Sequence, residues 1–417
     1  MTRDRIIPCL IFISFLFGFI LGEDTLGGGW HDYIYHKKYF LKFYENFTET
    51  FNNWGMDLVN ENVRNSPIFY IMHSQFLKVG LKVELIKYVN LAIIIPLVIF
   101  FYKCIDIKYQ NIDKNIKIYL TSILFLSPTV RTLLIWPYPF IWGLTFFVIS
   151  IYFYLKFERS GNDLDKFKYS IYNISLLALA AYFTPNFAVF SIYFFYKFYL
   201  EYKSSKKILG IIILNIFLAF PALSFLISRD FYLFNSMVMG VDVSTRFNIA
   251  NKIIIISSFI FLFFLPLVPR FSELKNYFTK LNSSYLSIFF LSIFIFANIY
   301  FFDFIDNVGG GLFYHLSNII LNNSFILYFV FLISVFFFYV IGLYNFNNIL
   351  IFIILIFYNM QFSIYYKYFD PLLVFVILFL LKFKEDNFIN LKIASDRYVI
   401  FYTIFLGLSI SKLYMNY

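Results

Sequence analysis

Charged side chains are scarce in this sequence. They make up 14% of its 417 residues, whereas hydrophobic side chains make up 61%. A soluble domain is about a quarter charged, so this composition excludes an ordinary soluble protein. It is typical of a polytopic membrane protein, whose spans are apolar because the bilayer core offers no water to polar groups.

Cysteine and histidine are also scarce. The two cysteines, Cys9 and Cys104, are too few for a disulfide framework or a cysteine-rich metal cluster, and the chain has only four histidines. We therefore expect no cofactor, and no metal site is indicated. Phenylalanine and tyrosine, by contrast, number 62 and 35. We attribute this abundance to an AT-rich coding sequence and do not interpret it as an aromatic binding groove.

Long apolar runs predict the fold class. Runs of about 17–25 residues suit α-helices that cross the hydrocarbon core. We predict an all-α polytopic membrane protein with about thirteen transmembrane helices, in a range of about 11–14 because short runs are ambiguous. The predicted spans lie near residues 6–22, 86–104, 116–130, 137–156, 168–184, 185–200, 207–227, 252–269, 284–303, 324–342, 347–360, 366–382 and 397–414.

The basic residues predict the orientation of these spans. Short cytoplasmic loops of membrane proteins are enriched in lysine and arginine. With a cytoplasmic N-terminus, most of the 34 basic residues fall in short inside segments, so the net charge of +10 reflects topology and not nucleic-acid binding. Residues 6–21 lack a following cleavage pattern, which predicts a retained signal anchor. The compact loops favour a bacterial inner membrane.

The longest predicted outer segment, residues 23–85, directly follows the first span. Its amphipathic stretches, 33–47 and 66–81, are too polar or too short to cross the membrane, so we expect interfacial helices. We divide the chain into a catalytic transmembrane module, residues 1–230, which includes this loop, and C-terminal helices, residues 231–417, which complete a cavity.

Polar chemistry is concentrated at the start of this outer loop. The ionisable side chains there are Glu23, Asp24, His31, Asp32 and His36. A carboxylate at a membrane interface can serve as a general base, and the three glycines at 27–29 let the backbone approach a ligand closely. Alternatively, the acidic residues solvate a helix end and the glycines form a flexible turn. We interpret the cluster as an active-site loop in which both histidines contact the substrate.

Isolated basic residues on the outer side are candidate partners for an anionic ligand. Arg64 precedes the apolar helix that Pro67 starts, Arg131 lies in the turn after the third span, and Lys367 opens the twelfth span beside Tyr366. Each cation can neutralise a phosphate. Each can equally be an anchor at the lipid headgroups.

Four short motifs resemble those of the GT-C superfamily, the polytopic glycosyltransferases that use polyprenyl-phosphate-linked sugars. The motifs are the acidic turn Glu23-Asp24 with Asp32, and the segments 66–70 (SPIFY), 126–131 (LSPTVR) and 366–371 (YKYFDP). The last three are similar to segments of the protein-mannosyltransferase-like branch. Only one proline of the usual pair is kept in SPIFY, and the usual Asp-Glu order is reversed at residues 23 and 24.

The resemblance implies a GT-C-like fold in which an aspartate activates the acceptor hydroxyl and basic residues hold the leaving lipid phosphate. By position, the role of base falls on Asp24 or Asp32, with Glu23 beside the first. The phosphate contacts fall on the outer basic residues Arg64, Arg131 and Lys367, the last next to Tyr366.

We therefore predict an integral membrane glycosyltransferase that moves a sugar from a polyprenyl-phosphate donor to a lipid, glycan or protein acceptor on the extracytoplasmic face. No nucleotide-binding domain is visible, which argues against a nucleotide-sugar donor. A transporter or flippase for lipid-linked sugars is an alternative, and it would carry charges in mid-span and internal repeats. A polysaccharide polymerase is another, and it would have its long outer loop late in the chain.

Overall fold

The computed structural model is all-helical in the part of the chain that it describes. That part comprises residues 3–25, 28–56, 65–203, 206–231, 248–268, 285–305, 309–341, 345–359, 361, 363–383 and 390–415, and none of them lies in a strand. Two compact units are present, residues 1–239 together with 398–417, and residues 240–397. The second unit thus differs from the predicted module 231–417 because the last twenty residues or so belong with the first unit.

Fewer helices than predicted are long enough to span a membrane. Within the described ranges, six helices have the length and hydropathy of a span, and a bent pair of helices gives a seventh candidate. The six are Arg3–Leu21, Val83–Lys108, Pro139–Arg159, Lys206–Ile227, Ile249–Leu267 and Leu391–Ile410. The bent pair, Lys114–Leu126 with Pro128–Ile135, turns by 64°. These helices are compatible with an integral membrane protein, but the predicted total of about thirteen spans is not confirmed.

The difference arises because an apolar run can be longer than the helix within it. The run predicted as a span at 347–360 holds α21 (Phe346–Tyr358), which has 13 residues, and the run at 324–342 holds α20 (Phe325–Val340), which has 16. At 1.5 Å per residue, 16 residues cover about 24 Å, less than the roughly 30 Å of the hydrocarbon core. Hydropathy therefore located these helices, but it counted as spans helices that are too short to cross the hydrocarbon core.

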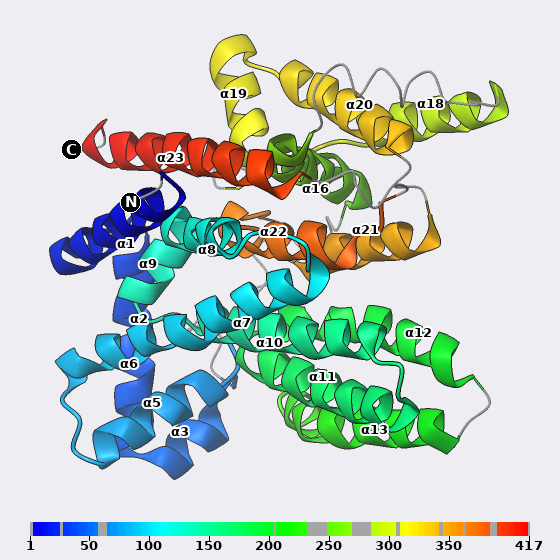
Figure 1. Cartoon of the computed structure of the whole chain (residues 1–417). Helices are drawn as coiled ribbons and strands as arrows, with labels where there is room; N and C mark the ends of the chain where they lie inside the picture. The colour runs from blue at the N-terminus through cyan, green and yellow to red at the C-terminus, as the bar shows by residue number, and fades with distance from the viewer. Residues whose placement is uncertain are drawn as a thin grey trace. The chain divides into compact units, whose positions relative to one another are not determined.

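The first unit is organised around α10 (Pro139–Arg159), which packs against α7 (Ile94–Lys108) and α11 (Asp163–Phe183), as Figure 1 shows. Most side chains of α10 are buried, so it lies inside the unit. The other helices of this unit are α1 (Arg3–Leu21), α2 (Gly29–Glu45), α3 (Phe47–Asn53), α5 (Ile68–Lys78), η1 (Val83–Leu85), α6 (Ile86–Ala92), α8 (Lys114–Ser122), η2 (Ile123–Leu126), α9 (Pro128–Ile135), η3 (Pro185–Val189), α12 (Phe190–Tyr202), α13 (Lys206–Ile227) and, from Tyr398 onward, α23 (Leu391–Met415).

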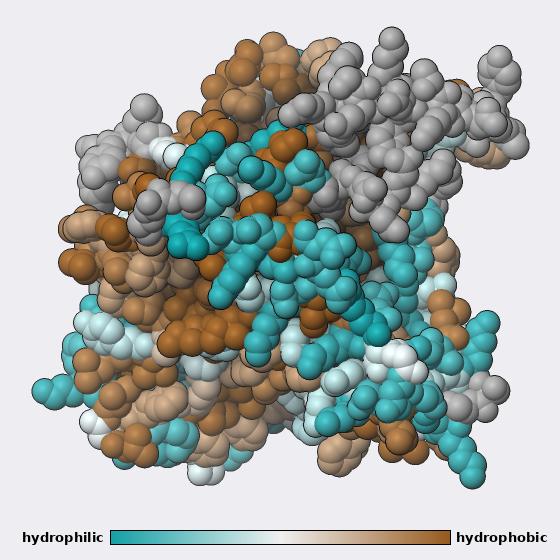
Figure 2. Space-filling view, viewed as in Figure 1, coloured by the Kyte–Doolittle hydropathy of each residue, from teal (hydrophilic) through white to brown (hydrophobic). Residues whose placement is uncertain are grey.

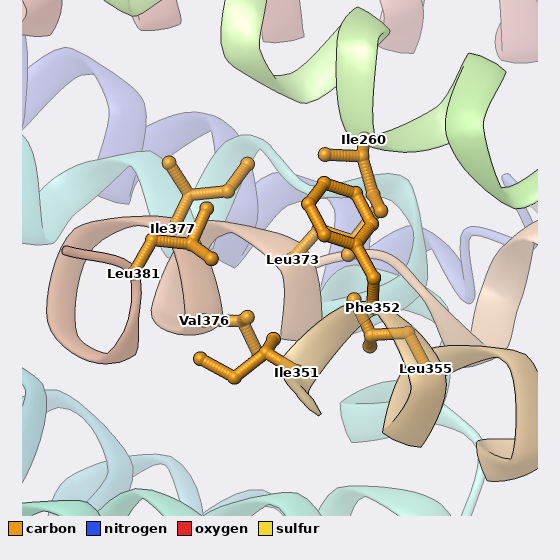
Figure 3. A pocket seen from close by; sticks show the side chains of 8 residues that line it. All are labelled: Ile260, Ile351, Phe352, Leu355, Leu373, Val376, Ile377 and Leu381. Carbon is orange, nitrogen blue, oxygen red and sulfur yellow. The ribbon is translucent and has the colours of Figure 1, made fainter. Parts of the chain in front are cut away.

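The second unit is organised around α16 (Ile249–Phe264), whose side chains are mostly buried. This helix packs against α20 and α21, which were introduced above, and against α18 (Tyr285–Tyr300) and α19 (Gly311–Leu321). The shorter helical segments of the unit are η5 (Leu265–Leu267), η6 (Tyr366–Tyr368), α22 (Leu372–Phe375) and the π-helical turn η7 (Val376–Leu380). An apolar hollow lies between α16, α21 and the α22–η7 segment, and all eight side chains that line it are apolar (Figure 3).

The predicted amphipathic stretches at 33–47 and 66–81 fold as α2 and α5, which pack against each other. Their contact is aromatic. Phe40 and Phe43 of α2 are fully buried, as are Phe69 and Tyr70 of α5. Burial of such large rings contributes strongly to stability, and it holds α2 and α5 together within the first unit.

Apolar side chains cover much of the surface. On α1, exposed side chains include Leu10, Phe17 and Leu21, and Figure 2 shows apolar residues over this helix. On α13, Ile211 is the one fully buried residue, and Phe217 and Phe220 are among its exposed apolar side chains. A contiguous apolar surface of this size suits contact with lipid, because water would not stabilise it.

Candidate functional site

The acidic turn, residues 22–25, begins where α1 ends. Gly22 has a φ of +67°, the left-handed conformation that favours glycine. Its N–H donates to the Phe19 carbonyl at 3.3 Å, and the N–H of Glu23 donates to the Gly18 carbonyl at 2.8 Å. This pair of bonds is the Schellman arrangement, which closes a helix end and reverses the chain. The chain therefore continues from α1 through Glu23 and Asp24 in a fixed direction.

Asp24 is bonded to the start of the next helix. Its Oδ1 accepts the N–H groups of Gly28 at 3.3 Å and Gly29 at 3.0 Å, and its Oδ2 accepts the N–H of Trp30 at 3.0 Å. The first N–H groups of a helix have no partner within the helix, and a carboxylate there also interacts favourably with the helix dipole. The half-buried carboxylate of Asp24 is thus held in one orientation between α1 and α2.

Glu23 forms a buried ion pair with Arg131 of α9. The Nε of Arg131 donates to Oε1 of Glu23 at 2.7 Å, and its Nη2 donates to Oε2. The side chains of Arg131 and Glu23 are only 3% and 12% exposed. The remaining guanidinium hydrogens go to both oxygens of Ser14 and to the Phe125 carbonyl. All five N–H donors of Arg131 are therefore used within the protein.

This arrangement bears on the predicted role of Arg131. A phosphate contact needs at least one N–H that points to the ligand, and the guanidinium has none left. We assign Arg131 instead the role of a residue that positions the acidic turn. The sequence did not reveal this pairing, since Glu23 and Arg131 lie 108 residues apart.

Further polar contacts attach the acidic turn to α9. The Thr25 hydroxyl donates to the Pro128 carbonyl at 2.9 Å and lies 2.9 Å from the Thr132 hydroxyl. The indole N–H of Trp136 donates to the Glu23 carbonyl at 3.2 Å. Sequence reasoning missed the contacts of Thr25, Thr132 and Trp136, and it placed Arg131 in a turn, whereas the residue lies within α9.

Two glycines make room for these contacts. A Cβ on Gly18 would overlap Oε2 of Glu23 and Nη2 of Arg131, so the ion pair occupies the space of the missing side chain. A Cβ on Gly29 would overlap Cγ2 of Thr132 and lie 3.1 Å from Oδ1 of Asp24. The glycine run was predicted to let the backbone approach a ligand, and at Gly29 the group that lies close is Thr132 of α9.

The other predicted residues of the first unit lie along α2. His31 is exposed and Asp32 is half-buried in the first turn. His36 is only 5% exposed, and its Nδ1 lies 2.8 Å from the Tyr70 hydroxyl. Its ring therefore packs in the aromatic contact between α2 and α5 and does not face outward.

The remaining predicted residues lie elsewhere. Arg64 is outside the described residues. Lys367 and Tyr366 belong to the second unit, where the Nζ of Lys367 lies 5.7 Å and 5.8 Å from the ring centres of Tyr365 and Tyr368. Tyr366 packs on the rings of Phe259 and Phe263 of α16. In the described part of the chain, no three metal-binding side chains come together.

Comparison of the chain with protein-family models, curated proteins and solved structures gives no match. The resemblance to the GT-C superfamily therefore rests on the short motifs of the sequence.

His73 of α5 is a buried neutral histidine close to this site. It is fully buried against the rings of Phe40, Phe69 and Trp142, and its Nδ1 donates to the Phe69 carbonyl at 2.8 Å. Burial lowers the pKa of His73 from its ordinary 6.5 to about 4, although the hydrogen bond to the Phe69 carbonyl opposes the change. His73 is therefore harder to protonate in the folded protein than in the unfolded chain.

The free energy of unfolding is therefore expected to fall as the pH drops from about 6.5 toward about 4, where only the unfolded chain is protonated at His73. Within this window, protonation of His73 in the unfolded chain lowers the free energy of unfolding by up to roughly 1.4 kcal/mol per pH unit. Unfolding measured in detergent at several pH values should show a shallower dependence in His73→Phe than in the parent. The exposed His31 provides the control, since His31→Phe should keep the parent's slope. Equal slopes in the parent and His73→Phe would contradict the prediction.

Proposed function

We propose that the protein is an integral membrane glycosyltransferase that moves a sugar from a polyprenyl-phosphate donor to a lipid, glycan or protein acceptor on the extracytoplasmic side. The observation that carries the proposal is the fixed carboxylate of Asp24 at the end of the first apolar helix. The donor's lipid tail requires a reaction centre at the membrane boundary. A carboxylate directly after a candidate span meets that requirement.

In the proposed reaction, Asp24 acts as the general base. It takes the proton of the acceptor hydroxyl while the hydroxyl oxygen forms a bond to the anomeric carbon of the sugar. The bond from that carbon to the phosphate oxygen breaks, and its electron pair leaves with the polyprenyl phosphate. Three backbone N–H groups hold the Asp24 carboxylate, and Oδ2 accepts only one of them, so a lone pair remains for the acceptor proton.

The neighbouring groups support this geometry. The Glu23–Arg131 pair and the contacts of Thr25 fix the backbone on both sides of Asp24. A base that is already oriented avoids the cost of ordering it in the transition state. Because all five N–H donors of Arg131 are used, another cation would have to stabilise the leaving phosphate, and Arg64 of the first unit stays the predicted candidate. Asp32, half-buried in the first turn of α2, remains the competing base.

A release assay tests the proposal without knowledge of the sugar or the acceptor. Membranes that contain the protein are given polyprenyl-phosphate-linked sugars, and free polyprenyl phosphate is measured as the product that every such transfer yields. A flippase would move the donor without this product. Loss of release in Asp24→Asn with retention in Asp32→Asn would assign the base, and full release in both variants would refute the mechanism.

A further inference from the structure

A lysine is buried in the second unit with no ion-pair partner among the residues that the structure describes. Lys252 lies in the first turn of α16 and is 2% exposed. Its Nζ donates to the carbonyl oxygen of Asn359 at 2.9 Å and to that of Gln361. Among the residues that the structure describes, no carboxylate forms an ion pair with it. The charge of Lys252 therefore meets only neutral oxygens.

A described acidic residue at this helix end, Asp303, is bound by amides. Oδ1 of Asp303 accepts Nδ2 of Asn248 at 2.9 Å and Nδ2 of Asn251 at 2.7 Å, and the Asp303 N–H donates to Oδ1 of Asn251 at 3.0 Å. These bonds join the end of α18 to the start of α16. They occupy Asp303 beside Asn251, the residue that precedes Lys252 in the chain.

An ammonium in this setting is costly unless an anion joins it. Removing a charged amine from water costs several kcal/mol, and carbonyl dipoles offset only part of this penalty. Lys252 also has three N–H donors, of which two have partners in the described part of the chain. One donor is left for a ligand, and an anion bound there would favour the charged form of the amine.

The position of Lys252 indicates the class of anion. It lies three residues inside the candidate span Ile249–Leu267, or about 4.5 Å along the helix axis. This is close to the level of the lipid headgroups, where phosphates are the abundant anions. A lysine there normally extends to the interface, whereas this one is turned into the protein. Ionisable side chains buried at such depths commonly mark functional sites.

Gln361 supplies a second group. Its backbone carbonyl accepts from Lys252, and its side-chain Oε1 is buried with no hydrogen-bond partner among the described residues. A half-turn of the amide would put Nε2 at that place, and Nε2 can donate to a phosphate oxygen. A buried amide end without a partner is unusual in a protein and calls for a ligand or a water molecule.

We propose that Lys252 and Gln361 form a binding site for the phosphate of a lipid headgroup. The ammonium supplies the positive charge, and the amide supplies a directed donor. The site is in the second unit and does not depend on the transfer reaction proposed for Asp24, so either proposal can fail without the other.

Thermal unfolding of the full-length protein in dodecyl maltoside micelles tests the site. Dodecyl phosphate should raise the Tm by several degrees relative to the same amount of added dodecyl maltoside, because a ligand that binds only the folded state stabilises it. A parallel experiment adds sodium phosphate, with sodium chloride at equal ionic strength as its control. It tests whether free phosphate, without a lipid chain, also binds the site. Stabilisation by dodecyl phosphate alone supports a headgroup site, and stabilisation by both supports recognition of the phosphate itself. No stabilisation by either overturns the proposal.

Two variants make the test specific. Gln361→Glu keeps the shape of the side chain and gives Lys252 an internal counter-charge, so the variant should fold and need at least about tenfold more dodecyl phosphate for the same shift. Lys252→Met should lose the shift entirely if it folds. Gln75→Glu makes the same substitution at an exposed position of α5 and should behave as the parent does. An unchanged response in Gln361→Glu would show that the phosphate binds elsewhere.

Discussion

Asp24→Asn is expected to lower the release of polyprenyl phosphate by about 100- to 10,000-fold, the usual contribution of a general base. Asparagine cannot take the acceptor proton at neutral pH. The fold should persist, because the asparagine Oδ1 can still accept the N–H groups of Gly28 and Gly29, and asparagine caps a helix about as well as aspartate does. One bond, from the Trp30 N–H, is lost.

The control for this variant is a second aspartate with the same structural role. Asp113 caps α8, where its Oδ1 accepts the N–H of Asn115 at 2.6 Å. Asp113→Asn removes the same charge and keeps the same kind of cap, so release should stay at the parent level. If the two variants lose release to the same extent, the effect of Asp24 is structural and not catalytic. A matching Tm for the parent and both variants would confirm that the folds are intact.

Arg131→Met is expected to lower the free energy of unfolding by about 3–5 kcal/mol, the range for loss of one partner of a buried ion pair. The loss is large because the Glu23 carboxylate, 12% exposed, would keep its charge without a partner. The carbonyl of Phe125 and the oxygens of Ser14 would also lose their donors. Denaturant titration in detergent micelles measures the difference.

Two further variants test whether the loss of stability comes from an unpaired buried charge. The double variant Glu23→Gln with Arg131→Met removes both charges and should recover much of the lost stability, because no unpaired charge remains. Lys166→Met breaks an ion pair with Glu201 whose side chains are 22% and 39% exposed, and it should cost less than about 1 kcal/mol. If Arg131→Met costs no more than Lys166→Met, the buried pair does not hold the turn.

The candidate site combines residues that local sequence patterns reveal with residues that they do not. Asp24 stands out because it follows an apolar run and precedes a helix start, and both features are local. Arg131 also stood out, as an isolated cation predicted to hold a phosphate, but its partners within the protein were not predicted. Its donors go to Glu23, Ser14 and Phe125, a set that only the packing of α1 against η2 and α9 brings together.

The glycines show the same division. The run of three glycines at 27–29 stood out in the sequence, and at Gly29 the missing side chain leaves room for Thr132 of α9. Gly18 gave no such signal, since a glycine within an apolar span is unremarkable. Its role depends on where the Glu23–Arg131 pair lies, and that position is fixed by contacts more than a hundred residues apart.

By itself, the sequence determined the helical class, the places of most helices, the amphipathic loop helices and the concentration of polar groups after the first span. These depend on composition and on the periodicity of neighbouring residues, which act over one or two helical turns. Only the tertiary structure decided how many helices are long enough to span a membrane, which partner Arg131 takes, and that Lys252 is buried against residues more than a hundred positions away. Such contacts follow from packing and from the pairing of buried polar groups, which couple distant segments and leave no periodic trace in the chain.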